Sequence, residues 1–213
     1  MSDGTPQIPR PRMQGLSDLI FGLALSIGAI QLVGTLPATS SDLAGALVAF
    51  GFSFLILINV WNRYTTTMSV MPFETSGLIR LNMLLLFLVA VEPFLFDVLF
   101  AKGLSTDVGA AASVYYGLDI GAMNLVLAYF THILASEEKA LIPKELIRKY
   151  KVIRDLLFLG GAIFLVSALP IFLAISVAGE PLRVIFWFIT IPVVWTHRFV
   201  DSRASKQMVL GPP

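Results

Sequence analysis

The chain has 213 residues, of which 56% are hydrophobic and only 14% are charged, and its mean hydropathy is +0.82. Average soluble domains are roughly 45–50% apolar and about a quarter charged, so this is the composition of a membrane protein without a separate soluble domain. The formal net charge of +1 gives no reason to expect a polyelectrolyte partner such as nucleic acid. The lack of cysteine excludes disulfides, thiolate metal sites and thiol nucleophiles.

Six apolar runs follow one another along the chain, and a helix of roughly 20 apolar residues is long enough to cross a bilayer. No small-residue cleavage site follows the first run, so we expect a retained helix rather than a signal peptide. The sequence therefore predicts an all-α membrane protein in which residues 1–213 form a single six-helix transmembrane unit. The helices are expected at about 17–34, 43–62, 81–101, 109–132, 153–178 and 182–199.

The basic residues are distributed unevenly between the two ends of these predicted helices. One end has only Lys102 and Arg183. Because Lys and Arg near helix ends accumulate on the cytoplasmic side, the opposite end is predicted to be cytoplasmic, together with both termini. That end holds Arg10, Arg12, Arg63, Arg80, Lys139, Lys144, Arg148, Lys149, Lys151, Arg154, Arg198, Arg203 and Lys206.

The connection over 136–151 allows two interpretations. Apolar residues such as Ile142 and Ile147 alternate with charges at helical spacing, as in an amphipathic helix at the membrane surface. A solvated linker is equally compatible with the same composition.

The first predicted helix carries an apolar stripe. At about 100° per residue, one side holds a line of mostly branched aliphatic residues, with Ser26 at its edge, and small residues lie on both flanks. Such a stripe is by itself more often a packing or lipid contact than a functional surface. Asp18 falls on the far side of the helix, where we expect it to be paired within the subunit. The stripe consists of Leu16, Ile20, Leu23, Ile27, Ile30 and Gly34. One flank is formed by Ala24 and Gly28, and the other by Gly22 and Ala29.

The head of this helix reads Arg-x-x-x-Leu-Ser-Asp, formed by Arg12, Leu16, Ser17 and Asp18. This motif resembles the Arg-x-x-x-Phe-Ser-Asp signature of the prokaryotic transmembrane protein 175 potassium channels. The likeness extends over roughly residues 12–135. It includes the aliphatic run 54–61 that closes on Trp61, then Leu81 and Asn82, then Glu92, Pro93 and Phe94, and then Tyr116, Gly117 and Leu118.

The resemblance implies a potassium-permeable homotetramer of six-helix subunits whose first helices line a central pore for monovalent cations. It places Leu23, Ile27 and Ile30 at hydrophobic constrictions, where a narrow apolar ring can close a pore by excluding water. Ser26 stands where the family usually has a Thr whose hydroxyl faces the ion. Beyond transient potassium near Ser26, no metal or cofactor is expected. The structural motif comprises Arg12, Leu16, Ser17, Asp18 and Asn82.

The chain departs from the family pattern at several positions. Leu16 replaces a Phe, Leu19 a Gly, Ser26 a Thr, and Gln31 a frequent acid. Because Ser lacks the methyl group that restricts the Thr rotamer, we expect a less selective hydroxyl ring. No Thr-Val-Gly-Tyr-Gly loop is present, so the conventional potassium filter is excluded.

Polar residues within the apolar runs are expected to face protein or water. Near the start of the first helix we predict a hydrogen-bonded cluster that joins the first three helices. Its expected members are Arg12, Ser17, Asp18, Asn59, Asn62, Arg63 and Asn82.

Two further functions stay open from the residues alone. Glu92, Asp97 and Asp119, together with Pro93, Pro170 and Pro192, are compatible with a secondary transporter or proton-coupled permease. A non-conducting membrane scaffold would need the stripe for packing only. No enzyme motif is present, and the expected location is a prokaryotic plasma membrane as a multi-pass protein in the lipid bilayer.

Overall fold

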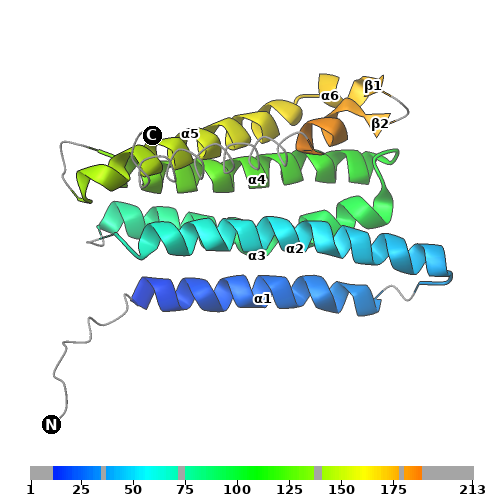
Figure 1. Cartoon of the computed structure of the whole chain (residues 1–213). Helices are drawn as coiled ribbons and strands as arrows, with labels where there is room; N and C mark the ends of the chain where they lie inside the picture. The colour runs from blue at the N-terminus through cyan, green and yellow to red at the C-terminus, as the bar shows by residue number, and fades with distance from the viewer. Residues whose placement is uncertain (1–11, 35–36, 72–74, 137–140, 178–179, 189–213) are drawn as a thin grey trace, which may run out of the picture.

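The computed structural model describes residues 12–34, 37–71, 75–136, 141–177 and 180–188, and these are almost entirely helical (Figure 1). Near the end of the described chain, two short strands of two residues each pair antiparallel, with Ser176 opposite Pro181. Residues 182–188, which follow the second strand, are again helical. In chain order they are α1 (Arg12–Gly34), α2 (Ser40–Met68), α3 (Ser76–Lys102), α4 (Asp107–Leu134), α5 (Lys144–Ser167), α6 (Ile171–Ala174), β1 (Ser176–Val177) and β2 (Glu180–Pro181).

Three of the helices begin at a threonine that caps their first turn. The hydroxyl of Thr39 accepts a hydrogen bond from the backbone N–H of Asp42 at 3.1 Å, and the Asp42 carboxylate accepts one from the N–H of Thr39 at 3.0 Å. Thr75 and Thr106 cap α3 and α4 in the same way from their side chains. Because the first N–H groups of a helix have no partner inside it, these caps fix where the helices start.

The turn between α3 and α4 depends on two glycines. Gly103 ends α3 with a φ of 68°, a left-handed conformation that other residues adopt only at a cost. A Cβ on Gly109 would lie 1.8 Å from the carbonyl oxygen of Gly103. The absence of both side chains therefore allows α4 to fold back directly on α3.

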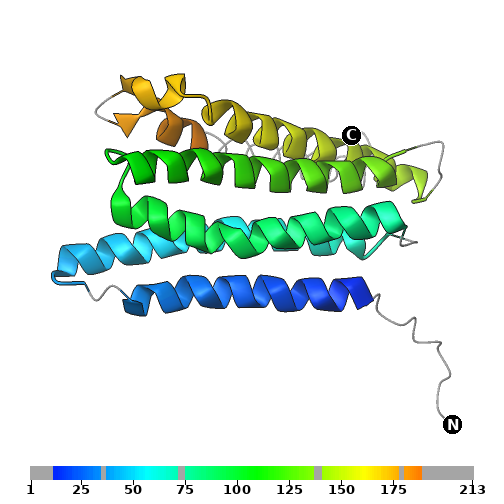
Figure 2. The same ribbon diagram turned by 180° about the vertical axis from the view of Figure 1, so that it is seen from behind.

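The helices are stacked in layers, with α1 at one edge of the bundle and α5 at the other (Figures 1 and 2). α1 packs on α2 and α3, whereas α4 lies between α3 and α5. We call the end of the bundle where α1, α3 and α5 begin the basic end, because most of the described Lys and Arg residues lie there. Its exposed cations are Arg80, Lys144, Arg148 and Lys149.

α4 and α5 approach each other closely at glycines. A Cβ on Gly121 would lie 2.7 Å from Cγ of Leu165, and one on Gly161 would lie 3.1 Å from the carbonyl oxygen of Gly121. Gly117, one turn before Gly121 on α4, would bring a Cβ within 3.2 Å of the carbonyl oxygen of Phe164. Small residues at this spacing let two membrane helices pack backbone to backbone.

Four described helices are long and apolar enough to cross a membrane, namely α1 to α4. They overlap the first four predicted runs, and the chain is a multi-pass helical membrane protein. The end of the predicted sixth run, 189–199, lies outside the described residues.

The fifth predicted run differs from the structure at both ends. α5 begins at Lys144, so residues 144–151 of the connection 136–151 form its first turns. The interpretation of the connection as a solvated linker is wrong for these residues. Ile147 is buried there as an amphipathic helix requires, but the segment is continuous with the apolar helix. α5 ends at Ser167 rather than near 178, because Pro170 lacks an N–H group and disfavours helix in the residue before it.

Candidate functional site

The predicted site lies on α1, the helix at the edge of the bundle, which has one buried and one exposed face. The buried face consists of residues at helical spacing that pack against α2 and α3. It is formed by Met13, Ser17, Phe21 and Ala24. The opposite face is largely exposed and holds most of the predicted stripe, although Ile20 is half-buried and packs against the core.

Ser17 joins the first three helices through its hydroxyl group. The oxygen lies 2.7 Å from the Tyr64 hydroxyl on α2, and it accepts a hydrogen bond from Nδ2 of Asn82 on α3 at 3.1 Å. The Ser17 hydroxyl is also within 2.8 Å of the carbonyl oxygen of Met13, one turn earlier on α1. Ser17, Tyr64 and Asn82 are all fully buried, so these hydrogen bonds replace water that none of the groups can reach.

Asp18 is paired with the second helix, as the sequence predicted for its side of α1. Nε1 of Trp61 donates a hydrogen bond to Oδ1 of Asp18 at 3.0 Å. The carboxylate is nevertheless exposed, which leaves its charge in contact with the surroundings of the subunit. Arg12 begins α1, and its side chain lies outside the described part of the structure. Leu16 is exposed.

Among the side chains that the structure describes, two members of the predicted hydrogen-bonded cluster are in direct contact. Ser17 and Asn82 meet directly, and Asp18 bonds separately to Trp61. Asn62 contributes its backbone carbonyl, which accepts from the Thr66 hydroxyl at 2.7 Å. Sequence reasoning missed the roles of Tyr64 and Trp61. Their position near the end of the apolar run of α2 could have indicated these roles. An aromatic ring with one polar group suits the boundary between apolar and polar surroundings, where that group can bind a hydrogen-bond partner.

The three stripe residues predicted to form pore constrictions are exposed. Leu23 is 60% exposed, Ile27 36% and Ile30 67%, although all three are branched aliphatic side chains. Ser26 is exposed on the same face, and its hydroxyl donates a hydrogen bond to the carbonyl oxygen of Gly22 at 2.8 Å. A row of exposed apolar residues on a helix that is packed on its other side must face lipid or a further protein surface.

The two flanks of the stripe differ. Ala24 is buried, and a Cβ on Gly28 would lie 3.6 Å from the Phe50 ring, so this flank packs on α2. On the other flank Gly22 and Ala29 are exposed, and a Cβ on Gly22 would meet no atom within 4 Å. Among the described helices, the flank with Ala24 and Gly28 is therefore the one that packs inside the subunit.

The predicted acids lie inside the bundle, away from the stripe. The hydroxyl of Ser53 donates to both carboxylate oxygens of Glu92 at 3.0 and 3.1 Å, and the Tyr116 hydroxyl donates to Oε1 at 3.4 Å. Asp119 is also buried, and its Oδ2 has no hydrogen-bond partner among the described residues. Asp97 is half-buried. These side chains connect α2, α3 and α4.

Arg183 is a buried cation that sequence reasoning placed only among the connections. Its guanidinium donates to the carbonyl oxygens of Ser167, Ala168 and Leu169 at 2.8, 3.1 and 3.2 Å, and also to the Ser113 hydroxyl. The group thus caps the C-terminal end of α5, where the last carbonyls of a helix lack N–H partners within it and a positive charge is favourable. The carbonyl oxygen of Leu169 also accepts a hydrogen bond from the backbone N–H of Phe172 at 3.1 Å. No local pattern in the sequence marks the contacts of Arg183.

Among the described residues, no group of three His, Asp or Glu side chains is arranged to hold a metal ion. The polar groups of the site are instead engaged in hydrogen bonds between helices.

Comparison with known proteins identifies the first part of the chain. Residues 12–93, which cover α1, α2 and most of α3, match the family described as "Endosomal/lysosomal potassium channel TMEM175". Over this segment the chain is similar to the TMEM175 family. The match confirms, over these residues, the resemblance predicted from the motif at residues 12–18. No curated protein matches the chain.

Two solved structures share the TMEM175 fold with this chain. A lysosomal potassium-selective channel TMEM175 homolog from Chamaesiphon minutus is 20% identical, with a TM-score of 0.55, over 74% of this chain and 87% of the other. A threonine-to-alanine variant of the potassium channel MtTMEM175, in complex with a nanobody–MBP fusion protein, is 19% identical. Its TM-score is 0.61, over 95% of this chain and 99% of the other. At these identities the likeness establishes the fold.

Proposed function

We propose that this protein is the subunit of a potassium-permeable cation channel whose pore is lined by α1. The observation that carries the proposal is the match of residues 12–93 to the TMEM175 potassium channel family. The likeness of fold to two proteins described as potassium channels supports it over most of the chain. A non-conducting scaffold would not explain why residues 12–93 match a potassium channel family.

The exposed stripe of α1 supports the position of the pore. Among the described helices, α1 packs on α2 and α3 through one face, so its exposed face can meet the same face of further subunits. Four subunits around an axis would bring Leu23, Ile27 and Ile30 into successive apolar rings. Such rings close a pore when they are narrow, because water leaves the constriction and a hydrated cation cannot enter.

Ser26 supplies the oxygen of the proposed ion site. Its hydrogen is directed to the carbonyl of Gly22, so the remaining lone pairs of the oxygen can be offered to a cation. Oxygen ligands replace part of the hydration shell of a potassium ion, which is how a ring of hydroxyls can give selectivity. Because Ser lacks the methyl group of Thr, we expect lower selectivity than in a channel with Thr at this position.

The assembly that this function requires is a homotetramer of six-helix subunits. The proposal places the basic end of the bundle and both termini in the cytoplasm, because positive charges are retained on that side. The protein would then reside in a prokaryotic plasma membrane. Its partners would be the lipid bilayer, monovalent cations and three further copies of the chain, with no cofactor.

A proton-coupled permease is the second candidate, and the buried acids favour it. Glu92 and Asp119 lie in the interior of the bundle, and one oxygen of Asp119 has no partner among the described residues. Ionisable groups inside membrane proteins often mark proton paths. Saturable transport without unitary current steps would support this candidate, whereas unitary steps would reject it.

The channel proposal is tested by making the central ring polar. Ile27→Asn should increase potassium flux into liposomes severalfold, because an amide ring keeps water in a constriction that isoleucine would empty. Leu159→Asn is the matched control, since Leu159 is exposed on α5 at the far edge of the bundle. It places the same amide in the membrane away from the proposed pore and should leave flux unchanged.

Equal flux in wild type and both variants, at equal protein content, would contradict the position of the gate at Ile27. Absence of any potassium flux in all three, over a range of voltage and pH, would contradict the channel itself. Native mass spectrometry of the purified protein should give a tetramer. A strict monomer would remove a pore made from four copies of α1.

A further inference from the structure

The exposed face of α5 changes from charged to apolar along the helix. Lys144, Arg148 and Lys151 follow one another at helical spacing in its first half, and the first two are exposed. Two turns further on, the same face exposes Phe158 and Leu159. α5 is not among the four described helices that are long and apolar enough to cross a membrane. We place its exposed apolar half in the hydrocarbon next to α4, which puts the basic half at the level of the lipid headgroups.

The opposite face of this basic half is anchored to the bundle. Ile142, Ile147 and Tyr150 are buried in a small apolar cluster with Leu134 at the end of α4. The hydroxyl of Tyr150 donates a hydrogen bond to the backbone carbonyl of Thr66 on α2 at 3.3 Å. The basic side chains are thus held in place by packing rather than carried on a loose segment.

The position of the charges is unfavourable for the helix itself. Lys144 lies in the first turn of α5, where the helix dipole favours negative charge. The preceding Pro143 provides no side-chain cap for the first N–H groups. Arg154 is neutralised by its neighbour Asp155 at 2.7 Å, but no ion pair is found for Lys144, Arg148 or Lys149 within the described residues.

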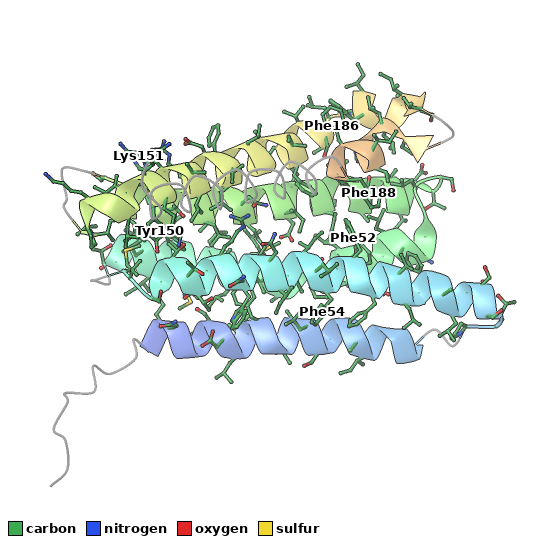
Figure 3. The ribbon with its side chains drawn as sticks, in the orientation of Figure 1. Phe52, Phe54, Tyr150, Lys151, Phe186 and Phe188 are labelled. Carbon is green, nitrogen blue, oxygen red and sulfur yellow. The ribbon has the colours of Figure 1, made fainter. Side chains whose placement is uncertain are left out.

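The cluster also lies on the outer edge of the bundle. α5 is separated from α1 by α3 and α4, and Figure 3 shows Tyr150 and Lys151 near its start, at the basic end. If α1 faces other subunits, α5 is the helix that meets surrounding lipid. A basic surface at headgroup level on such a helix is complementary in charge to anionic lipid.

We propose that the start of α5, formed by Lys144, Arg148 and Lys149, binds the headgroups of anionic phospholipids in the leaflet around the basic end. The planar guanidinium of Arg148 can donate two hydrogen bonds to one phosphate, and the two ammonium groups add attraction without fixed geometry. Each such charge near an anionic membrane surface strengthens binding roughly fivefold. This surface shares no residue with the proposed pore.

The experiment measures which lipids the full-length protein retains. Purified protein in detergent receives equal amounts of phosphatidylglycerol and phosphatidylcholine with the same acyl chains, and native mass spectrometry counts the bound lipids. The wild type should retain more phosphatidylglycerol. Arg148→Gln should lower the ratio about fivefold, and the triple variant of Lys144, Arg148 and Lys149 to Gln should bring it close to one.

Two single variants provide the controls. Arg148→Lys retains the charge and should keep most of the preference for phosphatidylglycerol. Lys102→Gln removes an exposed charge at the other end of the bundle and should not change the ratio. Equal retention of the two lipids by the wild type, or an unchanged ratio in Arg148→Gln and in the triple variant, would overturn the proposal.

A second arm separates lipid from soluble phosphate. Glycerol 3-phosphate, which carries the phosphate without acyl chains, is added at the concentration of the lipid. It should leave the bound phosphatidylglycerol in place, because the chains add apolar contact with the exposed face of α5. Displacement by an equal concentration of glycerol 3-phosphate would identify a site for soluble anions and reject the lipid assignment. Neither arm requires ion flux, so failure of the channel proposal would be recorded separately.

Discussion

Ser17 is the residue at which three helices meet, and its place in the sequence gives it two different roles. It belongs to the motif at residues 12–18 that resembles the channel family, and it is also a fully buried hydroxyl bonded to Tyr64 and Asn82. A second serine on the same helix, Ser26, is exposed and bonds only to its own helix. Ser17 therefore lies on the packing face of α1, and Ser26 lies on its exposed face.

Ser17→Ala should destabilise the protein, because it leaves the amide of Asn82 and the hydroxyl of Tyr64 without this partner in a place that excludes water. The expected loss is about 1–3 kcal/mol in the free energy of unfolding. Thermal unfolding in detergent, followed by circular dichroism, measures it as a lower Tm. Ser26→Ala is the matched control and should change stability by less than about 0.5 kcal/mol. Similar losses in the two variants would mean that the buried network contributes nothing specific.

At the scale of elements, the bundle is held by two different kinds of contact. α1, α2 and α3 are joined by polar groups, whereas α4 and α5 meet through glycines that bring their backbones together. The membrane offers no water to exclude between helices, so close van der Waals packing and hydrogen bonds must supply the attraction. Arg183 adds a third kind of contact, because its guanidinium donates a hydrogen bond to the carbonyl oxygen of Ser167 at the C-terminal end of α5.

Gly121→Val should weaken the contact between α4 and α5. The new Cβ would lie 2.7 Å from Cγ of Leu165, and relieving this overlap costs about 1–3 kcal/mol. Gly51→Val on α2 makes the same change where a Cβ would meet no atom within 4 Å. The Tm of the first variant should fall clearly below that of the second. Equal Tm values would show that the helices can separate without loss.

At the scale of the whole molecule, charge decides the orientation in the membrane. The basic end carries nearly all of the described cations, and the lysine and arginine residues of the opposite end are Lys102 and the buried Arg183. Because Lys and Arg are retained in the cytoplasm during insertion, the loop between α3 and α4 should lie outside.

The lack of cysteine in the natural sequence allows a direct test of this orientation. Ser105→Cys lies in the turn between α3 and α4, and Ser69→Cys follows the end of α2 at the basic end. Both side chains are exposed. A maleimide that cannot cross membranes should label Ser105→Cys in intact cells and Ser69→Cys only after permeabilisation. The reverse pattern would invert the predicted topology.

Part of the site followed from the sequence and part did not. Because the angle between residues of a helix is fixed, periodicity along α1 placed Leu23, Ile27 and Ile30 on one line and Ala24 on its flank. In the structure the three aliphatic residues are exposed and Ala24 is buried. The proposal that the exposed face lines a pore came from the resemblance to the channel family. Trp61 and Tyr64 were missed as partners, because the rotation of α2 against α1 determines which of its side chains point inward.

Hydropathy and helical periodicity are properties of one segment, so the sequence by itself determined the membrane class, the positions of α1 to α4 and the two faces of α1. Contacts between segments depend on how helices are rotated, stacked and ended relative to one another. Only the tertiary structure could therefore decide that Ser17 bonds Tyr64 and Asn82, that Arg183 caps α5, and that α5 begins at Lys144 and ends before Pro170. The physical reason is that these contacts exist only after the helices have packed.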